Sequence, residues 1–174
     1  MGQLVLAVLH GEGCDGRVEL AVSFLAIVRL GATVTPFPVQ YREYELAQLL
    51  PLSGAGLLIT GRESRAPEGT PTLSWPGDLE DVTGAEAPRR AADPAERVTI
   101  CWTSGTEATP KGVPRCHYDW LAVEAICTAA PALTGQDVIL NPFPMVNMAG
   151  INGMFLPWLK VGCLLYTSDA ADEL

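Results

Sequence analysis

Short apolar runs alternate with stretches of helical periodicity over the first sixty residues of the chain. Residues 4–10 (LVLAVLH) and 32–39 (ATVTPFPV) have the composition of strands, and 55–60 (AGLLIT) forms a third such run. Helices are predicted between them, over 17–31 (RVELAVSFLAIVRLG) and 42–50 (REYELAQLL). A chain that alternates strand and helix in this way pairs its strands in parallel through right-handed crossovers. The pattern therefore predicts an α/β fold, a parallel-rich sheet with flanking helices.

The first predicted helix carries apolar side chains at the spacing expected of a helix that packs on a sheet. These positions are Val18, Ala21, Val22, Leu25 and Val28. Gly31 follows them and is the expected C′ residue, because glycine readily adopts the left-handed conformation that ends many helices.

Residues 62–96 break the pattern, since Pro, Gly, Ala and charged residues replace the apolar runs. We expect an exposed connection there, with a strand fragment near 73–75 (LSW). Regular structure returns at 97–105 (RVTICWTSG), an apolar strand that runs into a loop.

The last part of the chain is predicted to hold two more helices and a strand. The first helix runs from Asp119 to Ala130, with Asp119 as a candidate N-cap. A strand follows at 138–140, then a turn region rich in Pro, Asn and Gly. An apolar helix begins near Gly150.

Composition and charge narrow the class of protein. With 174 residues, 48% hydrophobic and 18% charged, the chain is long enough for one globular domain. The chain has a net charge of −9 and lacks the clustered Lys and Arg side chains that a nucleic-acid surface needs. No secretory signal is recognised, and Pro157 and Lys160 interrupt the late apolar run, so we expect a cytoplasmic protein without a transmembrane segment. Five cysteines without a CxxC pair indicate reduced thiols, and two histidines leave little for a zinc site.

Residues 103–112 (TSGTEATPKG) place one lysine in a loop of small and hydroxylated residues. Small side chains let the backbone approach an anion, and Lys111 adds a charge that suits phosphate oxygens. The hydroxyl and N–H groups that can point into one concavity belong to Thr103, Ser104, Gly105 and Thr106. A loop lysine taken alone is more often simply solvated, and these hydroxyls could instead satisfy turn backbone. In combination, the composition predicts a phosphate-binding loop.

This loop resembles the phosphate-binding signature of the adenylate-forming enzymes, T-S-G-T-T-G-x-P-K-G-V. The superfamily includes acyl- and aryl-CoA ligases, luciferases and the adenylation domains of peptide synthetases. Glu107 and Ala108 depart from the signature, which usually has Thr and Gly there. The resemblance covers the chain from Leu4 to about Gly162. It assigns ATP and phosphate binding to Thr103, Ser104, Gly105, Thr106, Lys111 and Gly112.

Residues 144–151 (PMVNMAGI) resemble a second family segment, P-x-F-H-x-x-G, which lines the acyl pocket. Asn147 stands where the family has a gating histidine, and Val146 replaces its aromatic neighbour. An asparagine donates and accepts hydrogen bonds but carries no charge near neutral pH. We therefore expect Asn147 and Gly150 to shape a roomier, less aromatic pocket.

The resemblance implies a carboxylate–CoA ligase. Such an enzyme activates a carboxylic acid with ATP as an acyl-adenylate and transfers the acyl group to coenzyme A, with Mg²⁺ accompanying the ATP. The family's later motifs, including its catalytic lysine, are missing here. No catalytic residue or protein metal ligand is therefore assigned, and the chain alone is expected to be inactive. Residues 1–162 are expected to form a partial N-terminal domain, and residues 163–174 (CLLYTSDAADEL) a non-native tail.

Other functions would share the same loop. An adenylation domain of a peptide synthetase and a non-catalytic nucleotide- or phosphate-binding fragment both remain open. A structural domain that matches the signature by chance would show no effect of nucleotide on its stability.

Overall fold

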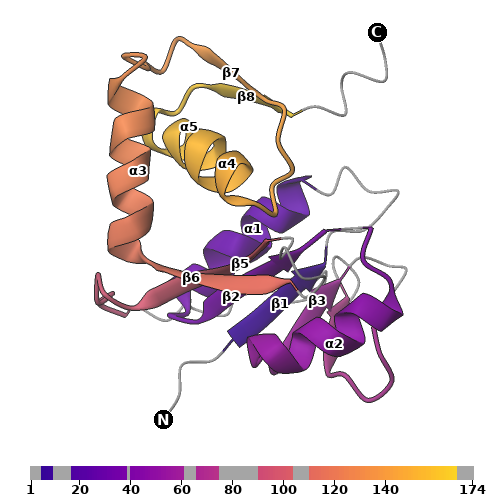
Figure 1. The fold of residues 1–174 in the computed structure, drawn as a ribbon. Helices are drawn as coiled ribbons and strands as arrows, with labels where there is room; N and C mark the ends of the chain where they lie inside the picture. Colours follow the sequence, from indigo (N-terminus) through magenta and orange to yellow (C-terminus); the bar gives the residue numbers. More distant parts are fainter. Residues whose placement is uncertain are drawn as a thin grey trace, which may run out of the picture. The chain divides into compact units, whose positions relative to one another are not determined.

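Six strands form one sheet in the first part of the chain, in the order β4–β3–β1–β2–β5–β6. β1 pairs in parallel with β2 and with β3, β2 pairs with β5, and β3 pairs with β4 (Figure 1). The parallel-rich sheet predicted from the sequence is confirmed. The strands are β1 (Val5–Leu9), β2 (Thr33–Phe37), β3 (Leu57–Thr60), β4 (Thr72–Ser74), β5 (Arg97–Thr103) and β6 (Lys111–Cys116).

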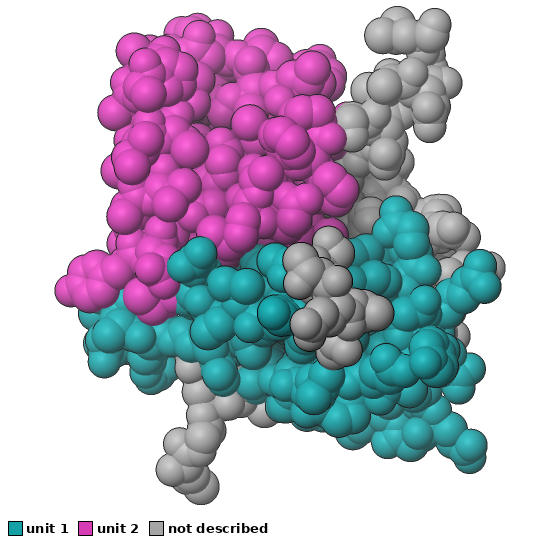
Figure 2. All heavy atoms as spheres, in the orientation of Figure 1, with its two compact units in different colours: residues 1–115 teal, residues 116–174 magenta. Residues whose placement is uncertain are grey.

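The computed structural model divides into two compact units, residues 1–115 (unit 1) and residues 116–174 (unit 2), which are coloured separately in Figure 2. The residues that the structure describes are 5–9, 17–38, 40–60, 66–74, 90–103 and 110–167.

Two helices cover the sheet of unit 1. α1 (Arg17–Arg29) connects β1 to β2, and α2 (Glu43–Ser53) connects β2 to β3. β2 and β3 lie on opposite sides of β1 in the sheet. Right-handed crossovers that run in opposite directions place their helices on opposite faces, as Figure 1 shows.

The core of unit 1 lies between α2 and the sheet. α2 contributes buried side chains three and four positions apart, which meet a sheet face carrying Phe37 and Leu58. A fully buried side chain of this size stabilises the fold by roughly 1.5–3 kcal/mol. The buried cluster consists of Phe37, Leu46, Leu49, Leu50 and Leu58.

α1 buries a different stripe from the predicted one. The side chains that it buries are Leu20, Ser23, Phe24 and Ile27. Part of the predicted stripe is instead exposed, at Val18, Val22 and Leu25. The helix carries apolar residues on two sides, so its periodicity is compatible with the burial of either side. The contact of α1 with β1 and β2 determines which side is buried. Its end is as predicted, because Gly31 has a left-handed φ of 72°.

Unit 2 is a helical layer against a two-stranded sheet, in which β7 and β8 are parallel and pair from Val138–Leu164 to Asn141–Thr167. One helical segment between them contains a π-turn, in which the Leu156 N–H donates to the Ile151 carbonyl. The elements are α3 (His117–Ala129), β7 (Val138–Asn141), α4 (Met148–Gly150), η2 (Ile151–Phe155), α5 (Leu156–Val161) and β8 (Leu164–Thr167).

The predicted N-cap of α3 is wrong by three residues. The helix begins at His117, and Cys116 is its N-cap. Asp119 instead occupies the third helical position, where its carboxylate accepts a hydrogen bond from the Cys116 N–H at 2.8 Å. This is a capping box with a cysteine in place of Ser or Thr, which the usual cap preferences do not identify.

An ion pair between a buried carboxylate and a half-exposed ammonium joins α3 to α5. Glu124 is only 5% exposed, although it is charged. The Lys160 ammonium lies 3.0 Å from one oxygen of its carboxylate and 3.1 Å from the other. The Thr128 hydroxyl donates to the same carboxylate at 2.6 Å. The charge is therefore fully compensated where it is buried.

β8 lies in the segment that was expected to be a tail. Its residues Leu164–Thr167 pair in register with β7, so the fold continues past Gly162. Residues 168–174 lie outside the described residues. The non-native origin of 163–174 remains a prediction.

Candidate functional site

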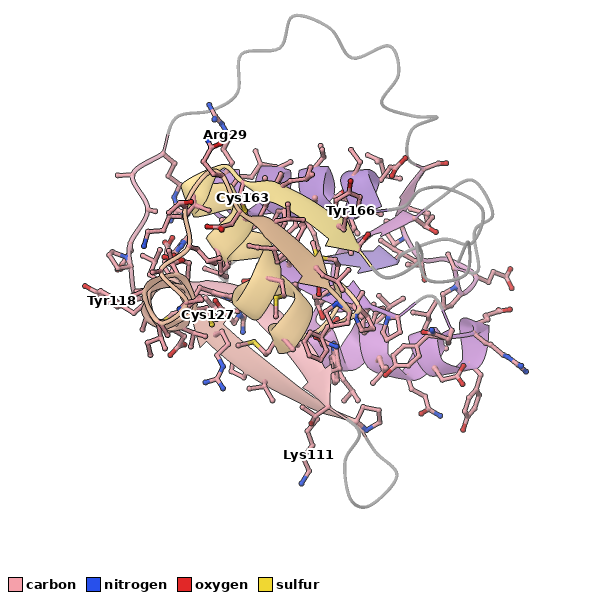
Figure 3. The ribbon with its side chains drawn as sticks, turned by 90° about the horizontal axis from the view of Figure 1, so that it is seen from above. Arg29, Lys111, Tyr118, Cys127, Cys163 and Tyr166 are labelled. Atoms are coloured by element: carbon pink, nitrogen blue, oxygen red, sulfur yellow. The ribbon has the colours of Figure 1, made fainter. Side chains whose placement is uncertain are left out.

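The two ends of the predicted phosphate loop lie together in unit 1. β5 ends at Thr103 and β6 begins at Lys111. The Thr103 hydroxyl donates to the Lys111 carbonyl at 3.4 Å, which closes the base of the loop. Ser104, Gly105 and Thr106 lie outside the described residues. Lys111 is exposed at the start of a strand, and its side chain extends away from the sheet (Figure 3).

The strand that leads into this loop is held firmly by its neighbours. The Trp102 indole N–H donates to the Thr35 hydroxyl at 2.8 Å, and that hydroxyl donates to the Ile100 carbonyl at 3.0 Å. The Trp102 ring also stacks on Phe37, with ring centroids 5.9 Å apart. Because Phe37 belongs to the core beneath α2, these contacts tie the loop base to the core of unit 1.

Gly112 has a packing reason to be glycine. A Cβ added there would lie 2.9 Å from Cγ2 of Ile100 and 3.3 Å from the Trp102 ring. The absence of a side chain leaves room for the Ile100 and Trp102 side chains of β5, the neighbouring strand in the sheet. Beside these side chains lies a cavity of about 430 Å³, lined by Leu52, Arg97, Ile100, Trp102, Pro110, Gly112 and Pro114.

The predicted acyl-site residues lie together in unit 2, at the start of α4. Asn147 is the N-cap, and its side-chain oxygen accepts a hydrogen bond from the Gly150 N–H at 2.9 Å. Only the oxygen of an amide can accept, so this bond fixes which way the group is turned. The Nδ2 end of the half-buried Asn147 is therefore the end that can donate to a ligand.

Gly150 is buried where two backbone segments almost touch. A Cβ there would lie 2.3 Å from the Pro144 carbonyl oxygen and 3.1 Å from that of Phe143. These are backbone atoms, so they cannot give way as a flexible side chain can. The turn after β7 thus packs directly on the first turn of the helix, and only glycine permits this approach.

Asn141, which was not predicted from the sequence, contacts this turn at several points. It is fully buried at the end of β7. Its only sequence signal is a polar residue directly after an apolar strand. The side chain accepts from the Phe143 N–H at 3.0 Å and donates towards the Gly150 carbonyl at 3.4 Å and the Met145 sulfur at 3.3 Å.

The structure therefore brings Thr103 to Lys111 and Asn147 to Gly150. The first pair belongs to unit 1 and the second to unit 2.

The Cys101 thiol, in the strand that leads into the loop, is unreactive at neutral pH. Burial raises the pKa of Cys101 to about 11, and the opposing effects of a Thr99 hydrogen bond and the Arg115 charge do not offset it. Cys101 is therefore a protonated packing residue at neutral pH. Within the described ranges, no group of three or more His, Cys, Asp or Glu side chains could hold a metal ion. The same ranges contain no helix that is both long and apolar enough to cross a bilayer.

Comparison with known proteins places this fold among adenylate-forming enzymes. The family model described as "AMP-binding enzyme" matches residues 14–174. The chain belongs to the AMP-binding enzyme family, which confirms the resemblance found in the sequence.

Curated relatives include CoA ligases and a peptide synthetase. The chain is 29% identical to 4-coumarate–CoA ligase 3 of Oryza sativa subsp. japonica, over 92% of this chain and 32% of that protein. It is 29% identical to the medium-chain fatty-acid–CoA ligase of Escherichia coli (strain K12), over 89% of this chain and 33% of that protein. It is also 32% identical to the siderophore peptide synthetase fer3 of Mycosarcoma maydis, over 86% of this chain and 3% of that protein. The chain thus spans about a third of the length of the CoA ligases.

Solved structures agree on the fold. The Klebsiella oxytoca NpsA N-terminal subdomain in complex with 3-hydroxybenzoyl-AMSN superposes with a TM-score of 0.80 at 20% identity. The match covers 97% of this chain and 41% of that one. A malonyl-CoA ligase ternary product complex with methylmalonyl-CoA and AMP gives 0.76 at 20% identity, over 93% of this chain and 34% of that one.

Proposed function

We propose that the chain is the N-terminal part of an ATP-dependent carboxylate–CoA ligase. In the reaction, a carboxylate oxygen attacks the α-phosphorus of ATP, which gives an acyl-adenylate and releases pyrophosphate. The thiol of coenzyme A then attacks the acyl carbon and releases AMP. Mg²⁺ accompanies the ATP. The family match and the CoA ligases among the relatives support this proposal.

The observation that carries the proposal is the closed base of the loop in unit 1. Thr103 bonds to the backbone of Lys111, so the lysine charge stands at the mouth of a loop rich in hydroxyl and N–H groups. As pyrophosphate leaves, negative charge grows on its oxygens. The Lys111 ammonium, together with the hydroxyl and N–H groups of Ser104, Gly105 and Thr106, would stabilise that charge more than it stabilises bound ATP.

In unit 2, Asn147 and Gly150 would bind the acid. The capping bond to Gly150 engages the Asn147 oxygen, so the Nδ2 group is the donor available for an oxygen of the acid. A neutral donor can hold either a carboxylate or the carbonyl of the acyl-adenylate. The buried Gly150 leaves no side chain in this part of the pocket.

A peptide-synthetase adenylation domain is the second candidate, and a specific observation favours keeping it. A siderophore peptide synthetase is 32% identical to this chain over 86% of the chain's length. Both candidates form an acyl-adenylate and differ in the thiol that accepts the acyl group. The residues that bind phosphate and acid are the same in either case.

The experiment compares the thermal stability of the chain with and without Mg-ATP and with and without Mg-pyrophosphate, beside Lys111→Ala. A ligand that binds only the folded chain stabilises it by about 2.7 kcal/mol at a hundredfold excess over its dissociation constant. We expect pyrophosphate to raise the melting temperature of the wild type and not that of Lys111→Ala.

The matched control is Arg29→Ala, which removes one positive charge from the last turn of α1 in the same unit. Figure 3 shows Arg29 and Lys111 at opposite sides of the molecule. Arg29→Ala should therefore keep the full effect of pyrophosphate. Equal losses in both variants would mean that net charge, and not the loop, attracts the ligand. No effect of either ligand on a cooperatively melting wild-type chain would refute phosphate binding by this unit.

A further inference from the structure

The turn between β7 and α4 is tied together by one buried side chain. Asn141 contacts three points along the next nine residues, the Phe143 N–H, the Met145 sulfur and the Gly150 carbonyl. Its first bond joins the turn to the strand end, and the bond to Gly150 joins the strand end to the helix. The side chain therefore links both ends of the turn.

A second buried asparagine in the same unit shows that burial alone does not create such a link. Asn152 in η2 is 1% exposed, and neither its oxygen nor its nitrogen has a hydrogen-bond partner among the described residues. Asn141 is equally buried and uses both ends of its amide. A buried amide is costly unless it is hydrogen-bonded, so the Asn141 contacts stabilise the conformation that makes them.

The geometry of the proposed acid site depends on that conformation. Gly150 packs against the Pro144 carbonyl only because the turn is drawn onto the helix. The Gly150 N–H in turn engages the Asn147 oxygen and leaves the Nδ2 group as the donor. If Gly150 moves, the Asn147 amide loses the bond that orients it.

We propose that Asn141 is a positioning residue for the acid site. It fixes Gly150 and, through Gly150, the direction in which Asn147 presents its donor. The assignment rests on the proposed function for its link to the acid, and on the structure alone for its link to Gly150. Asn141 touches no substrate in this proposal.

The test measures backbone hydrogen exchange in the full chain with Asn141→Asp, and with Asn152→Leu as the matched control. Aspartate keeps an acceptor for the Phe143 N–H but, when ionised, cannot donate to the Gly150 carbonyl. Leucine has the heavy-atom shape of asparagine and removes an amide that bonds to nothing described. We expect the Gly150 amide to exchange at least about fivefold faster in Asn141→Asp, the effect of losing the hydrogen bond to Gly150, of net ~1 kcal/mol, together with the weaker contact to the Met145 sulfur. Asn152→Leu should leave it unchanged.

Two results would overturn the proposal. Unchanged exchange at Gly150 in Asn141→Asp would show that the contact does not hold the turn. A uniform increase across α3, β7 and η2 would show that Asn141 stabilises unit 2 as a whole and positions nothing in particular.

A titration with hexanoate and with benzoate then examines the link to the acid. We expect each wild-type shift of the Asn147 side-chain N–H signals to weaken at least fivefold in Asn141→Asp, while the response to pyrophosphate stays the same. If neither acid moves these signals in the wild type, the acid site is refuted. The exchange result still decides whether Asn141 positions the turn, so the two failures are distinguishable.

Discussion

Replacing Gly150 with alanine tests the packing of the turn on the helix directly. The new Cβ would lie 2.3 Å from the Pro144 carbonyl oxygen and 2.9 Å from its carbon. Ordinary contacts between carbon and oxygen exceed 3 Å, so the backbone of the turn must retreat by about 1 Å. Overpacking of this kind typically costs 1–3 kcal/mol. The retreat would also break the bond from Asn141 to the Gly150 carbonyl, which adds ~1 kcal/mol. The expected loss is therefore about 2–4 kcal/mol.

Gly153→Ala provides the control, because it makes the same change three residues further along the same helical segment. No atom of the residues that the structure describes lies within 4 Å of the Cβ that would be added at Gly153. Alanine is favoured over glycine in a helix by roughly 0.5–1 kcal/mol, so this variant should be slightly stabilised. The two substitutions are thus expected to change stability in opposite directions.

Thermal unfolding followed by circular dichroism measures the difference. For a chain of this size, 1 kcal/mol corresponds to roughly 2–4 °C in melting temperature, so Gly150→Ala should melt about 5–15 °C lower. Gly153→Ala should melt at the wild-type temperature or slightly above it. A Gly150→Ala variant as stable as Gly153→Ala would refute the reasoning, since the turn could then move away without loss.

Two further predictions concern packing and pH. Leu46 is fully buried, so Leu46→Ala should destabilise unit 1 by about 2–5 kcal/mol in urea unfolding. Leu52 lies in the same helix but is 64% exposed, so Leu52→Ala should change the stability little. Similar losses in both variants would contradict the assigned core. Hydrogen bonds from the Thr134 backbone N–H and hydroxyl lower the pKa of Asp137, so its stabilising contribution is present above the ordinary aspartate pKa and is lost as the pH falls through the lowered value. Wild-type stability should therefore fall more steeply than that of Asp137→Asn in melts between about pH 5 and pH 2, and parallel curves would rule this contribution out.

The order of strands and helices in unit 1 could be predicted because local pattern and topology agree there. Each strand is a short apolar run, and each helix returns the chain to the same edge of a parallel sheet. The stripe that α1 buries could not be predicted, because Val18 and Leu20 are both apolar and lie on different sides of the helix. Only the contact with the sheet determines that the side with Leu20 is buried. β6 was missed because its sequence, KGVPRC, contains glycine and proline and takes its extended form from its neighbour β5.

The candidate site was predicted in part. Thr103 and Lys111, and likewise Asn147 and Gly150, were named from their motifs, and the structure brings each pair together; their roles in phosphate and acyl binding remain predictions. Asn141 was not named, because a buried asparagine has no periodicity and its role depends on contacts with residues up to nine positions away. The Asn147 cap was also unforeseen, since the same side chain could equally have pointed its nitrogen towards the helix.

The ion pair between Glu124 and Lys160 constrains how this chain can diverge. Loss of Lys160 alone leaves the buried Glu124 carboxylate without its counter-charge, which typically costs 3–5 kcal/mol, whereas loss of Glu124 leaves only a half-exposed lysine in contact with water. A neutral residue at position 160 should therefore be rare wherever position 124 keeps its carboxylate. Among homologues, the two positions should covary across an interval of thirty-six residues. In a multiple alignment, the contact between α3 and α5 would then be visible as correlated substitutions at positions 124 and 160.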